Sequence, residues 1–385
     1  MSCNANRDRL RGYRIKLYPT EDQKQELDRN IQIARAVYNL ALEIENRLYN
    51  EGKPHARYFE LTKIFSELKC NESFNWLNEV SLETIRSSLR NLDVGFEKFF
   101  SKITRYPKFK SRRKSKKNFG VRSDRTHVNG KYISISGLKN KLIKAKKHPI
   151  PEGSRMYDCT ISFDGYDYWF SCCVETPKKD MNNIPQSDPI GIDVGVRNMV
   201  TTSNEEYYHF YNTDKLTKRL KRQQKRLSRD YEKYITEAFH TRTKYEDVPK
   251  SKNHLKRLAK QRKTYDRIRN KRYNDMNNTT KQIVERNPSA IVIENISVRD
   301  ILSDPAMKKY APQLVFYELH RQLKYKAEDR GIPIITAEKD YPSSRICSCC
   351  GFYHKPSGHI FKCPNCGLRM DRDYNAALNL KALAY

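Results

Sequence analysis

The pattern of apolar and polar positions predicts a strand followed by helices in the first hundred residues. Residues 13–18 alternate as in a β-strand. Thr20 with Gln23 has the spacing of a capping box, and Gly52 with Pro54 predicts where the helix that follows ends. A second helix is expected after Ser81, because apolar residues again recur in steps of three and four. The two apolar stripes consist of Leu27, Ile31, Ala34, Tyr38 and Ala41, and of Leu82, Ile85, Leu89, Leu92, Phe96, Phe99 and Ile103. Residues 20–104 are therefore predicted to form a helical lobe.

The composition changes after this lobe. Residues 101–117 contain nine basic residues and no acidic residue, with Tyr106 and Phe109 interleaved. Strand-like runs follow at 131–136, 158–163 and 168–174, the last two joined by an Asp-Gly-Tyr-Asp turn. Together with the N-terminal strand, this segment is expected to close a small β-barrel. Residues 177–189 have the composition of a linker.

From residue 190 the pattern is that of an α/β fold. Strands are predicted at 190–194, 197–203, 290–294 and 333–337, and helices near 316–329 and 375–383. Between the second and third strands lies a long helical pair, basic on its outer faces. Its helically spaced apolar positions are Leu216, Leu220, Leu227, Tyr231 and Tyr234, and Leu255, Leu258, Tyr265 and Ile268. The predicted fold class is α/β plus a β-barrel and a helical lobe.

Composition limits what such a chain can do. Hydrophobic residues at 37% and aromatic residues at 11% exclude a disordered chain, and no apolar run approaches the ~18 residues of a membrane span. The first residues lack the apolar region of a secretory signal, so we expect ten cysteines in a reducing, cytoplasmic compartment to serve metal binding. With a net charge of +30, repulsion among the basic residues destabilises the folded protein unless a polyanion neutralises them. Nucleic acid is the expected partner. A membrane surface is less favoured, because the basic residues are spread over the chain.

Four cysteines have the spacing of a zinc site. Cys347 with Cys350 and Cys363 with Cys366 form two C-x-x-C pairs separated by twelve residues, each followed by glycine. Four thiolates fill the tetrahedral shell of one Zn²⁺, so this site is expected to be structural. Cys349 inside the first pair leaves open which cysteine binds. We expect Cys3, Cys70, Cys159, Cys172 and Cys173 to be core or surface thiols.

Three acidic residues lie next to apolar segments, where burying a charged carboxylate costs free energy. Asp193 and Glu294 end apolar strands, and Asp373 opens the final predicted helix. A buried carboxylate must be paired, protonated or bound to metal. If the three meet at one sheet edge, they can hold two Mg²⁺ ions ~4 Å apart for attack on a phosphodiester. The simpler alternatives are a turn role for Asp193 and N-cap roles for Asp371 and Asp373.

These segments resemble a known family. GIDVGVRNMVTTS, IVIENI and DRDYNAALNL are similar to the three motifs of RuvC-type nucleases, with SSRICSCCG and CPNCG between the second and third, as in the TnpB family. YRIKLYPTEDQKQELDRNIQIARAVYN and RYPKFKSRRK are similar to the same family, so the resemblance spans nearly the whole chain. TnpB proteins are RNA-guided nucleases of insertion sequences, related to type V CRISPR effectors.

The resemblance implies an RNase H-like RuvC domain with an inserted zinc ribbon, a wedge β-barrel and a helical recognition lobe. It places the wedge barrel at 1–19 and 105–185, the recognition lobe at 20–104 and the RuvC domain at 186–341 and 369–385. The zinc-ribbon, target-nucleic-acid-binding insert is expected at 342–368. It makes Asp193, Glu294 and Asp373 the catalytic acids that bind two Mg²⁺ ions, and it favours Asp373 over Asp371.

The implied function is RNA-guided cleavage of both strands of DNA. A guide RNA derived from the transposon end pairs with one strand of a double-stranded target, and the protein, monomeric in the ribonucleoprotein, reads a short adjacent motif. Basic residues would contact phosphates, while Tyr106 and Phe109 either stack on bases or pack internally. The expected nucleic-acid contacts are Tyr106, Lys108, Phe109, Lys110, Arg112, Arg113, Arg219, Arg222, Arg226, Arg257 and Arg262.

Two other functions stay in competition. A nuclease-inactive, RNA-guided DNA-binding regulator would have lost RuvC acids, and all three are present. A DNA transposase can also use an RNase H-like core, so the acids do not discriminate, although no His-x-His pattern of an HUH-type enzyme occurs.

Overall fold

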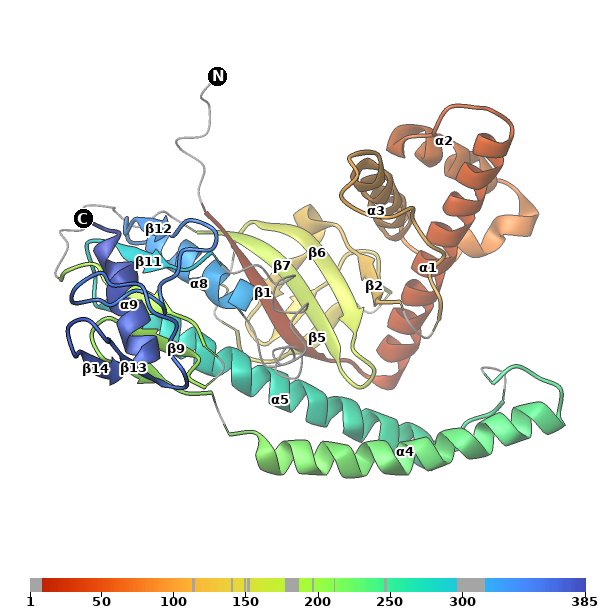
Figure 1. Cartoon of the computed structure of the whole chain (residues 1–385). Coiled ribbons are helices and arrows are strands. Elements are labelled where there is room, and N and C mark those ends of the chain that lie inside the picture. The colour runs from red at the N-terminus through yellow and green to blue at the C-terminus, as the bar shows by residue number, and fades with distance from the viewer. Residues whose placement is uncertain are drawn as a thin grey trace, which may run out of the picture. The chain divides into compact units, whose positions relative to one another are not determined.

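The computed structural model describes residues 9–112, 115–139, 141–148, 150, 153–176, 187–195, 197–210, 212–245, 248–295 and 316–385. The chain divides into two compact units, Met1–Pro177 and Lys178–Tyr385 (Figure 1). Most of the predicted linker, residues 177–186, lies outside the described residues.

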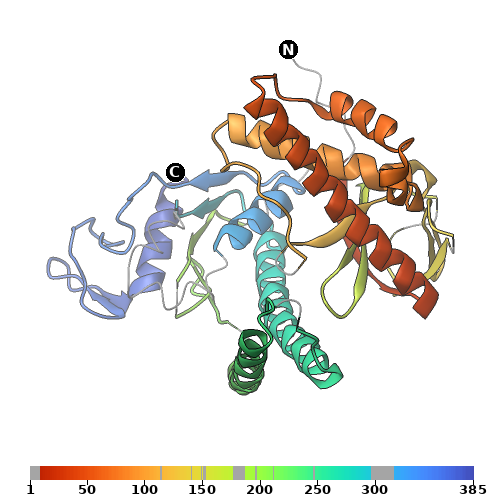
Figure 2. The ribbon, with the colours of Figure 1, turned by 90° about the vertical axis from the view of Figure 1, so that its right-hand side faces the viewer.

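Helices form one part of the first unit. They are α1 (Glu21–Asn50), α2 (Tyr58–Leu68) and α3 (Leu82–Phe100), with a 3-10 segment at Glu72–Glu79. The capping box of Thr20 and Gln23 is present, and Ser81 caps α3. Figure 2 shows the three helices lying together, and they share one apolar core that includes Val37, Phe65 and Leu89. The predicted helical lobe thus has the expected helices, with α2 as an additional one.

The predicted stripe of α3 is too long at both ends. Leu82 is 42% exposed, and Ile103 is 72% exposed and lies beyond the last helical residue, Phe100. Lys102 has a positive φ of 57°, so the chain turns away from the helix axis before Ile103 can reach the core.

A seven-stranded sheet forms the rest of the first unit. The strands are β1 (Arg9–Tyr18), β2 (Lys117–Gly120), β3 (His127–Asn129), β4 (Tyr132–Ser134), β5 (Leu142–Ala145), β6 (Met156–Phe163) and β7 (Tyr168–Thr176). Their order is β2-β6-β7-β1-β5-β4-β3, and all recorded pairs are antiparallel. The long strand β1 lies between β7 and β5, so the N-terminal strand does join the later strands as predicted. Within the described part of the chain β2 and β3 do not pair, so the recorded pairing leaves the expected barrel open at these edges.

The second unit contains a five-stranded mixed sheet. Its strands are β8 (Ile190–Asp193), β9 (Val200–Thr202), β10 (Tyr207–Tyr208), β11 (Ile291–Ile293) and β12 (Ile334–Thr336), in the order β10-β9-β8-β11-β12. Strands β8, β11 and β12 are parallel, and β9 and β10 are antiparallel to their neighbours. The four predicted strands are all found, each shorter than its apolar run.

Helices cover both faces of this sheet. Residues of α5 (Lys252–Glu285) and α8 (Phe316–Glu328) pack on the face formed by Ile192 and Ile293. Helix α9 (Arg372–Ala382) packs on the other face, where Leu380 contacts Val292. A side chain at Gly191 would overlap the backbone of α9 at Ala377 and Lys381. Glycine at this position therefore lets α9 lie directly on β8.

The basic helical pair is a long hairpin of α4 (Asp214–His240) and α5, which lie side by side in Figures 1 and 2. Leu220, Leu227 and Ile268 are buried as predicted. Other predicted seam positions are exposed, namely Tyr231, Leu255 and Tyr265 at 40%, 52% and 54%. A two-helix hairpin buries only one narrow stripe per helix, which is less than the sequence pattern predicted.

A small two-stranded sheet, β13 (Ile360–Lys362) and β14 (Arg369–Asp371), precedes α9. Among the described residues, no helix is both long enough and apolar enough to cross a membrane.

Candidate functional site

Two of the predicted acids lie side by side at the carboxyl ends of parallel strands. Asp193 is the last residue of β8, and Glu294 directly follows β11. Ile192 pairs with Ile293 in this parallel ladder, so the next step along both strands brings Asp193 beside Glu294. Because side chains alternate between faces, both acids point to the face of the sheet that α9 covers.

The third acid approaches from α9. Asp373 stands in the first turn of this helix, and its Oδ2 lies 3.8 Å from the position that a Cβ at Gly195 would occupy, just after Asp193. Asp371 is the N-cap: its Oδ1 accepts hydrogen bonds from the backbone N–H groups of Asp373 (2.9 Å) and Tyr374 (3.3 Å). The cap role is therefore correct for Asp371, and the carboxylate of Asp373 is left to face the strand ends.

The negative charges of Glu294 and Asp373 repel that of Asp193. Burial, followed by the charges of Glu294 and Asp373, raises the pKa of Asp193 well above its usual range. Burial also raises the pKa of Glu294, against a hydrogen bond of 2.6 Å from the Ser343 hydroxyl to Oε1 that lowers it. Nη2 of Arg372 lies 3.5 Å from Oδ1 of Asp373. Buried carboxylates in such a group become stable when a cation neutralises them, and carboxylate oxygens are the donors that Mg²⁺ prefers. The residues present thus fit divalent cations.

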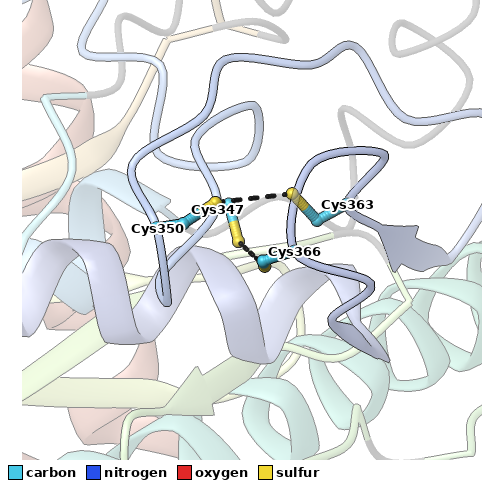
Figure 3. A group of neighbouring side chains, drawn as sticks. All are labelled: Cys347, Cys350, Cys363 and Cys366. Carbon is cyan, nitrogen blue, oxygen red and sulfur yellow. Dashed lines mark hydrogen bonds between the residues drawn. The ribbon is translucent and has the colours of Figure 1, made fainter.

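The four predicted cysteines form a second cluster. Sγ of Cys347 lies 3.6 Å from Sγ of Cys366, and Sγ of Cys350 lies 3.6 Å from Sγ of Cys363 (Figure 3). Tetrahedral Zn²⁺ with Zn–S bonds of about 2.3 Å separates sulfur atoms by about 3.8 Å. Among His, Cys, Asp and Glu of the described ranges, this is the one group of three or more whose ligand atoms all lie within 4.8 Å of one another. The three acids are spread more widely.

The other cysteines are not part of this cluster. Cys349 is exposed and is not one of the four cysteines whose sulfurs converge, so Cys347, Cys350, Cys363 and Cys366 are the candidate ligands. Cys159 and Cys172 are buried in the core of the first unit, where burial raises the pKa of each thiol to about 12. Cys70 is exposed, Cys173 is half-buried, and Cys3 lies outside the described residues.

The basic segment after α3 borders a cavity within the first unit. This cavity, of about 160 Å³, lies between α1, α3 and β2, and its one carboxylate, Asp28, accepts a hydrogen bond from the Tyr168 hydroxyl (2.7 Å). Its cationic lining consists of Arg35, Lys110, Arg112, Lys116 and Lys117. Burial lowers the pKa of Lys110 to about 8, although its Nζ lies 3.7 Å from the centre of the Tyr38 ring, a cation–π contact. The excess of positive charge suits an anionic ligand.

The two aromatic residues of this segment behave differently. Tyr106 packs edge-on against Phe96 and Phe99, with ring centres 5.5 and 5.3 Å away, and its hydroxyl donates to Asn46 (2.7 Å). Phe109 is 56% exposed. Tyr106 therefore packs on one side against α3 while it is 42% exposed, and Phe109 has the more exposed ring.

The basic residues expected to bind nucleic acid are exposed to different degrees. Arg219, Arg222 and Arg226 of α4 are exposed, and so are Lys108 and Arg112 of the first unit. Arg262 is half-buried, and Arg113 lies outside the described residues. Arg257 donates to both oxygens of Asp230, at 2.7 and 2.8 Å, so its charge is already paired.

Sequence reasoning missed three buried polar residues around the acids: Ser343, Asn375 and Asn379, each at most 5% exposed. Asparagines on the apolar face of a short helix are the signal that could have revealed them, because a buried amide must find partners.

The architecture and these clusters define a class: a mixed α/β protein that carries a four-cysteine cluster and a set of acids at the ends of sheet strands. Three family models match the chain, described as "Helix-turn-helix domain" at residues 9–54, "Probable transposase" of the OrfB_IS605 type at 171–303, and "Cas12f1-like, TNB domain" at 316–380. Residues 9–54 form β1 and the single helix α1, so the first label does not describe the fold found here.

Relatives of known sequence extend this likeness over almost the whole chain. A protein of Streptomyces pristinaespiralis named "Putative RNA-guided DNA endonuclease" is 29% identical over 97% of this chain and 89% of its own length. "Putative RNA-guided DNA endonuclease InsQ" of Escherichia coli (strain K12) is 24% identical over 98% of this chain and 93% of its own length. By these family-model matches and relatives, the chain is similar to TnpB proteins.

The fold is also found among solved structures. A Cas12f1 protein, seen by cryo-EM in complex with sgRNA and target DNA, aligns with a TM-score of 0.53 and 15% identity over 93% of this chain and 82% of that chain. The likeness supports the mixed α/β architecture.

Proposed function

We propose that this protein is an RNA-guided DNA endonuclease that cleaves both strands of a target at one RuvC-type site. The observation that carries the proposal is the meeting of Asp193, Glu294 and Asp373 on one face of the sheet. The order β10-β9-β8-β11-β12, with three parallel and two antiparallel strands, supports an RNase H-like domain at 186–341 and 369–385. The relatives named as RNA-guided DNA endonucleases support the same activity.

Asp193, Glu294 and Asp373 would hold two Mg²⁺ ions. Bound there, the ions supply an activated water and stabilise the leaving oxygen of the phosphodiester. The chain's own contribution is to hold three carboxylates in a partly water-excluded place. Ser343 orients Glu294, the register of β8 and β11 sets the first two acids side by side, and α9 brings the third.

Cys347, Cys350, Cys363 and Cys366 would bind one structural Zn²⁺ in the insert at 342–368. The spacing of their sulfur atoms is close to that of a tetrahedral site. With four protein ligands no position is left for substrate, so the ion's part is to fold the insert.

The partners of this activity would be a guide RNA from the transposon end and double-stranded DNA with an adjacent motif. The charge of +30 and the cationic cavity of the first unit support a polyanionic partner. We assign the wedge strands to 1–19 and 105–185 and the recognition lobe to 20–104. The prokaryotic cytosol and nucleoid are the proposed location.

The deciding experiment is cleavage of DNA matched to the RNA that co-purifies with the protein. We expect both labelled strands to be cut in Mg²⁺, and only when guide and target match. Cutting that ignores the guide sequence would contradict the proposal.

A transposase is the second candidate, favoured by the family model described as "Probable transposase". It predicts covalent joining of transposon ends to new DNA without a guide. A nuclease-inactive regulator is disfavoured, because all three acids are present and the charges of Glu294 and Asp373 act on Asp193.

A further inference from the structure

A buried hydrogen-bond relay connects Glu294 to helix α9. The Ser343 hydroxyl donates to Oε1 of Glu294 at 2.6 Å. The backbone carbonyl of Ser343 in turn accepts a hydrogen bond of 2.7 Å from Nδ2 of Asn379. Ser343 is 1% exposed and Asn379 is 5% exposed, so water does not compete for these bonds.

The same face of α9 fastens the loop that carries Ser343 at a second place. Asn375 and Asn379, one helical turn apart, both donate to the carbonyl of Ile346, at 2.7 and 2.6 Å. Oδ1 of Asn375 accepts from the backbone N–H of Ser348 at 3.0 Å. Both asparagines are buried, and leaving such amides unsatisfied is costly, so the loop has one position on the helix.

The relay therefore ties two acids to one rigid element. Asp373 stands on α9 itself, and Glu294 is held to α9 through Ser343 and Asn379. The bond from Ser343 occupies Oε1 of Glu294, and no protein hydrogen bond to Oε2 is recorded within the described segments. A carboxylate held by one oxygen presents the other in a fixed direction.

We propose that Ser343 is a positioning residue for Glu294, and that Asn379 holds Ser343 so that the orientation of Glu294 is set by the helix that carries Asp373. This inference rests on the proposed function, since it concerns the same acid site. Ser343 does not touch the reacting atoms. Its effect is to fix the direction in which Glu294 offers an oxygen to a divalent cation.

The test uses the full chain with its co-purified RNA and four variants. Ser343→Ala removes the hydroxyl, and Ser343→Thr keeps it. Ser348→Ala is the matched control in the same loop. Among the described residues the one recorded partner of the Ser348 hydroxyl is the Met370 sulfur (3.9 Å), while its backbone makes the bond to Asn375. Asn379→Ala removes the bond that holds Ser343.

Binding of Mn²⁺, followed by electron paramagnetic resonance, reports on the site without any cleavage. The ions lost in Asp193→Ala define those held by the acid site rather than by RNA. We expect Ser343→Ala to weaken this binding by about tenfold, because its hydrogen bond to the charged Glu294 is lost. Asn379→Ala should weaken it in the same direction, because Ser343 is then no longer held on α9. The Mg²⁺ concentration for half-maximal cleavage should rise by the same factor. Ser343→Thr should restore both, and Ser348→Ala should leave both unchanged.

Unchanged Mn²⁺ binding in Ser343→Ala would overturn the inference. So would loss of zinc, of RNA binding or of the thermal transition in that variant, because Ser343 would then hold the fold rather than the acid. Failure of the proposed function looks different: Asp193→Ala would then cut as well as the unchanged protein.

Discussion

At the scale of single residues, the carboxylate of Asp193 is costly for the free protein and essential for the proposed chemistry. Burial beside Glu294 and Asp373 penalises its charge. We expect Asp193→Asn to lower cleavage of both strands by at least about 1,000-fold, since the acids act as one unit. The same variant should unfold at a higher temperature in the absence of divalent cations. Strand-specific cleavage and thermal unfolding in a chelator measure the two effects.

Asp371 supplies the control for this prediction. As an N-cap it should cost about 1 kcal/mol of stability when replaced by alanine, with cleavage retained. Asp373→Asn should abolish cleavage. If Asp371→Ala abolishes cleavage and Asp373→Asn does not, the third acid is Asp371. Loss of cleavage on one strand alone would indicate a second active site.

Lys110 gives a prediction about pH. Its pKa of about 8 lies below that of an exposed lysine, so the folded protein releases this proton before the unfolded chain does. Stability should therefore rise between about pH 8 and pH 10 in the unchanged protein, and this rise should be smaller in Lys110→Met. At pH 7 the variant should be the more stable protein but should bind nucleic acid less tightly. The measurements are thermal unfolding and binding titrations across this pH range.

Lys108→Met is the matched control, because Lys108 is exposed. It should weaken nucleic-acid binding through lost charge and leave the pH dependence of stability as it was. A similar pH profile in both variants would show that Lys110 is not the titrating group.

At the scale of elements, the α4–α5 hairpin offers charges of two kinds. Arg219, Arg222 and Arg226 are exposed, whereas Arg257 is paired with Asp230. Replacing the three arginines of α4 with glutamine should weaken RNA binding and reduce the slope of log K against log salt by about 2–3. Arg257→Gln should change the slope by less and lower the stability of the hairpin slightly. If the slope of log K against log salt is the same in both variants and the unchanged protein, RNA does not bind to the α4–α5 hairpin.

The cysteine cluster is tested by metal content. Cys363→Ser should reduce zinc from about one ion per chain to near zero, because one of four ligands is lost. Cys349→Ser should keep its zinc, since Cys349 is exposed and outside the cluster. Zinc lost from the second variant would show that the ligand assignment is wrong.

The elements also show how far sequence patterns extend. The capping box, the stripe of α1, the strands β8 and β11 and the cysteine spacing are encoded by neighbours along the chain, and the structure confirms them. The short strands β2, β3, β5, β10, β13 and β14 were missed, because two to four residues carry too little periodicity.

The polar contacts around the acids could not be predicted either. Ser343 meets Glu294 across 49 residues of sequence, and Asn379 meets Ser343 across 36. Such pairs depend on the fold as a whole. The exposed side chains of Tyr265 and Leu255 were misjudged for the opposite reason: local spacing suggested a buried seam, but among the described elements none covers it.

At the scale of the whole molecule, a net charge of +30 makes the free protein dependent on a polyanion. Protein purified in low salt should carry nucleic acid that RNase removes and DNase does not. After its removal, solubility should require high salt. The ratio of absorbance at 260 and 280 nm, before and after each nuclease, is the measurement. Stable RNA-free protein that cuts DNA by itself would contradict the guide hypothesis.

Helix α9, which packs directly on β8, is the last element of the chain, and this affects the order in which the acid site forms during synthesis. The ribosome makes the guide-binding candidates of the first unit and the acids of β8 and β11 before it makes α9. A growing chain can thus form its cationic surfaces while its set of acids is still incomplete. Because Gly191 has no side chain, the space on β8 that α9 later occupies stays open. Under the proposed function, a nonsense mutation anywhere between the codons for Glu294 and Asp373 should leave the acid set incomplete and abolish cleavage. In terms of the proposed function, the order of the chain completes the acid site last, after the cationic first unit and both strand acids have been made.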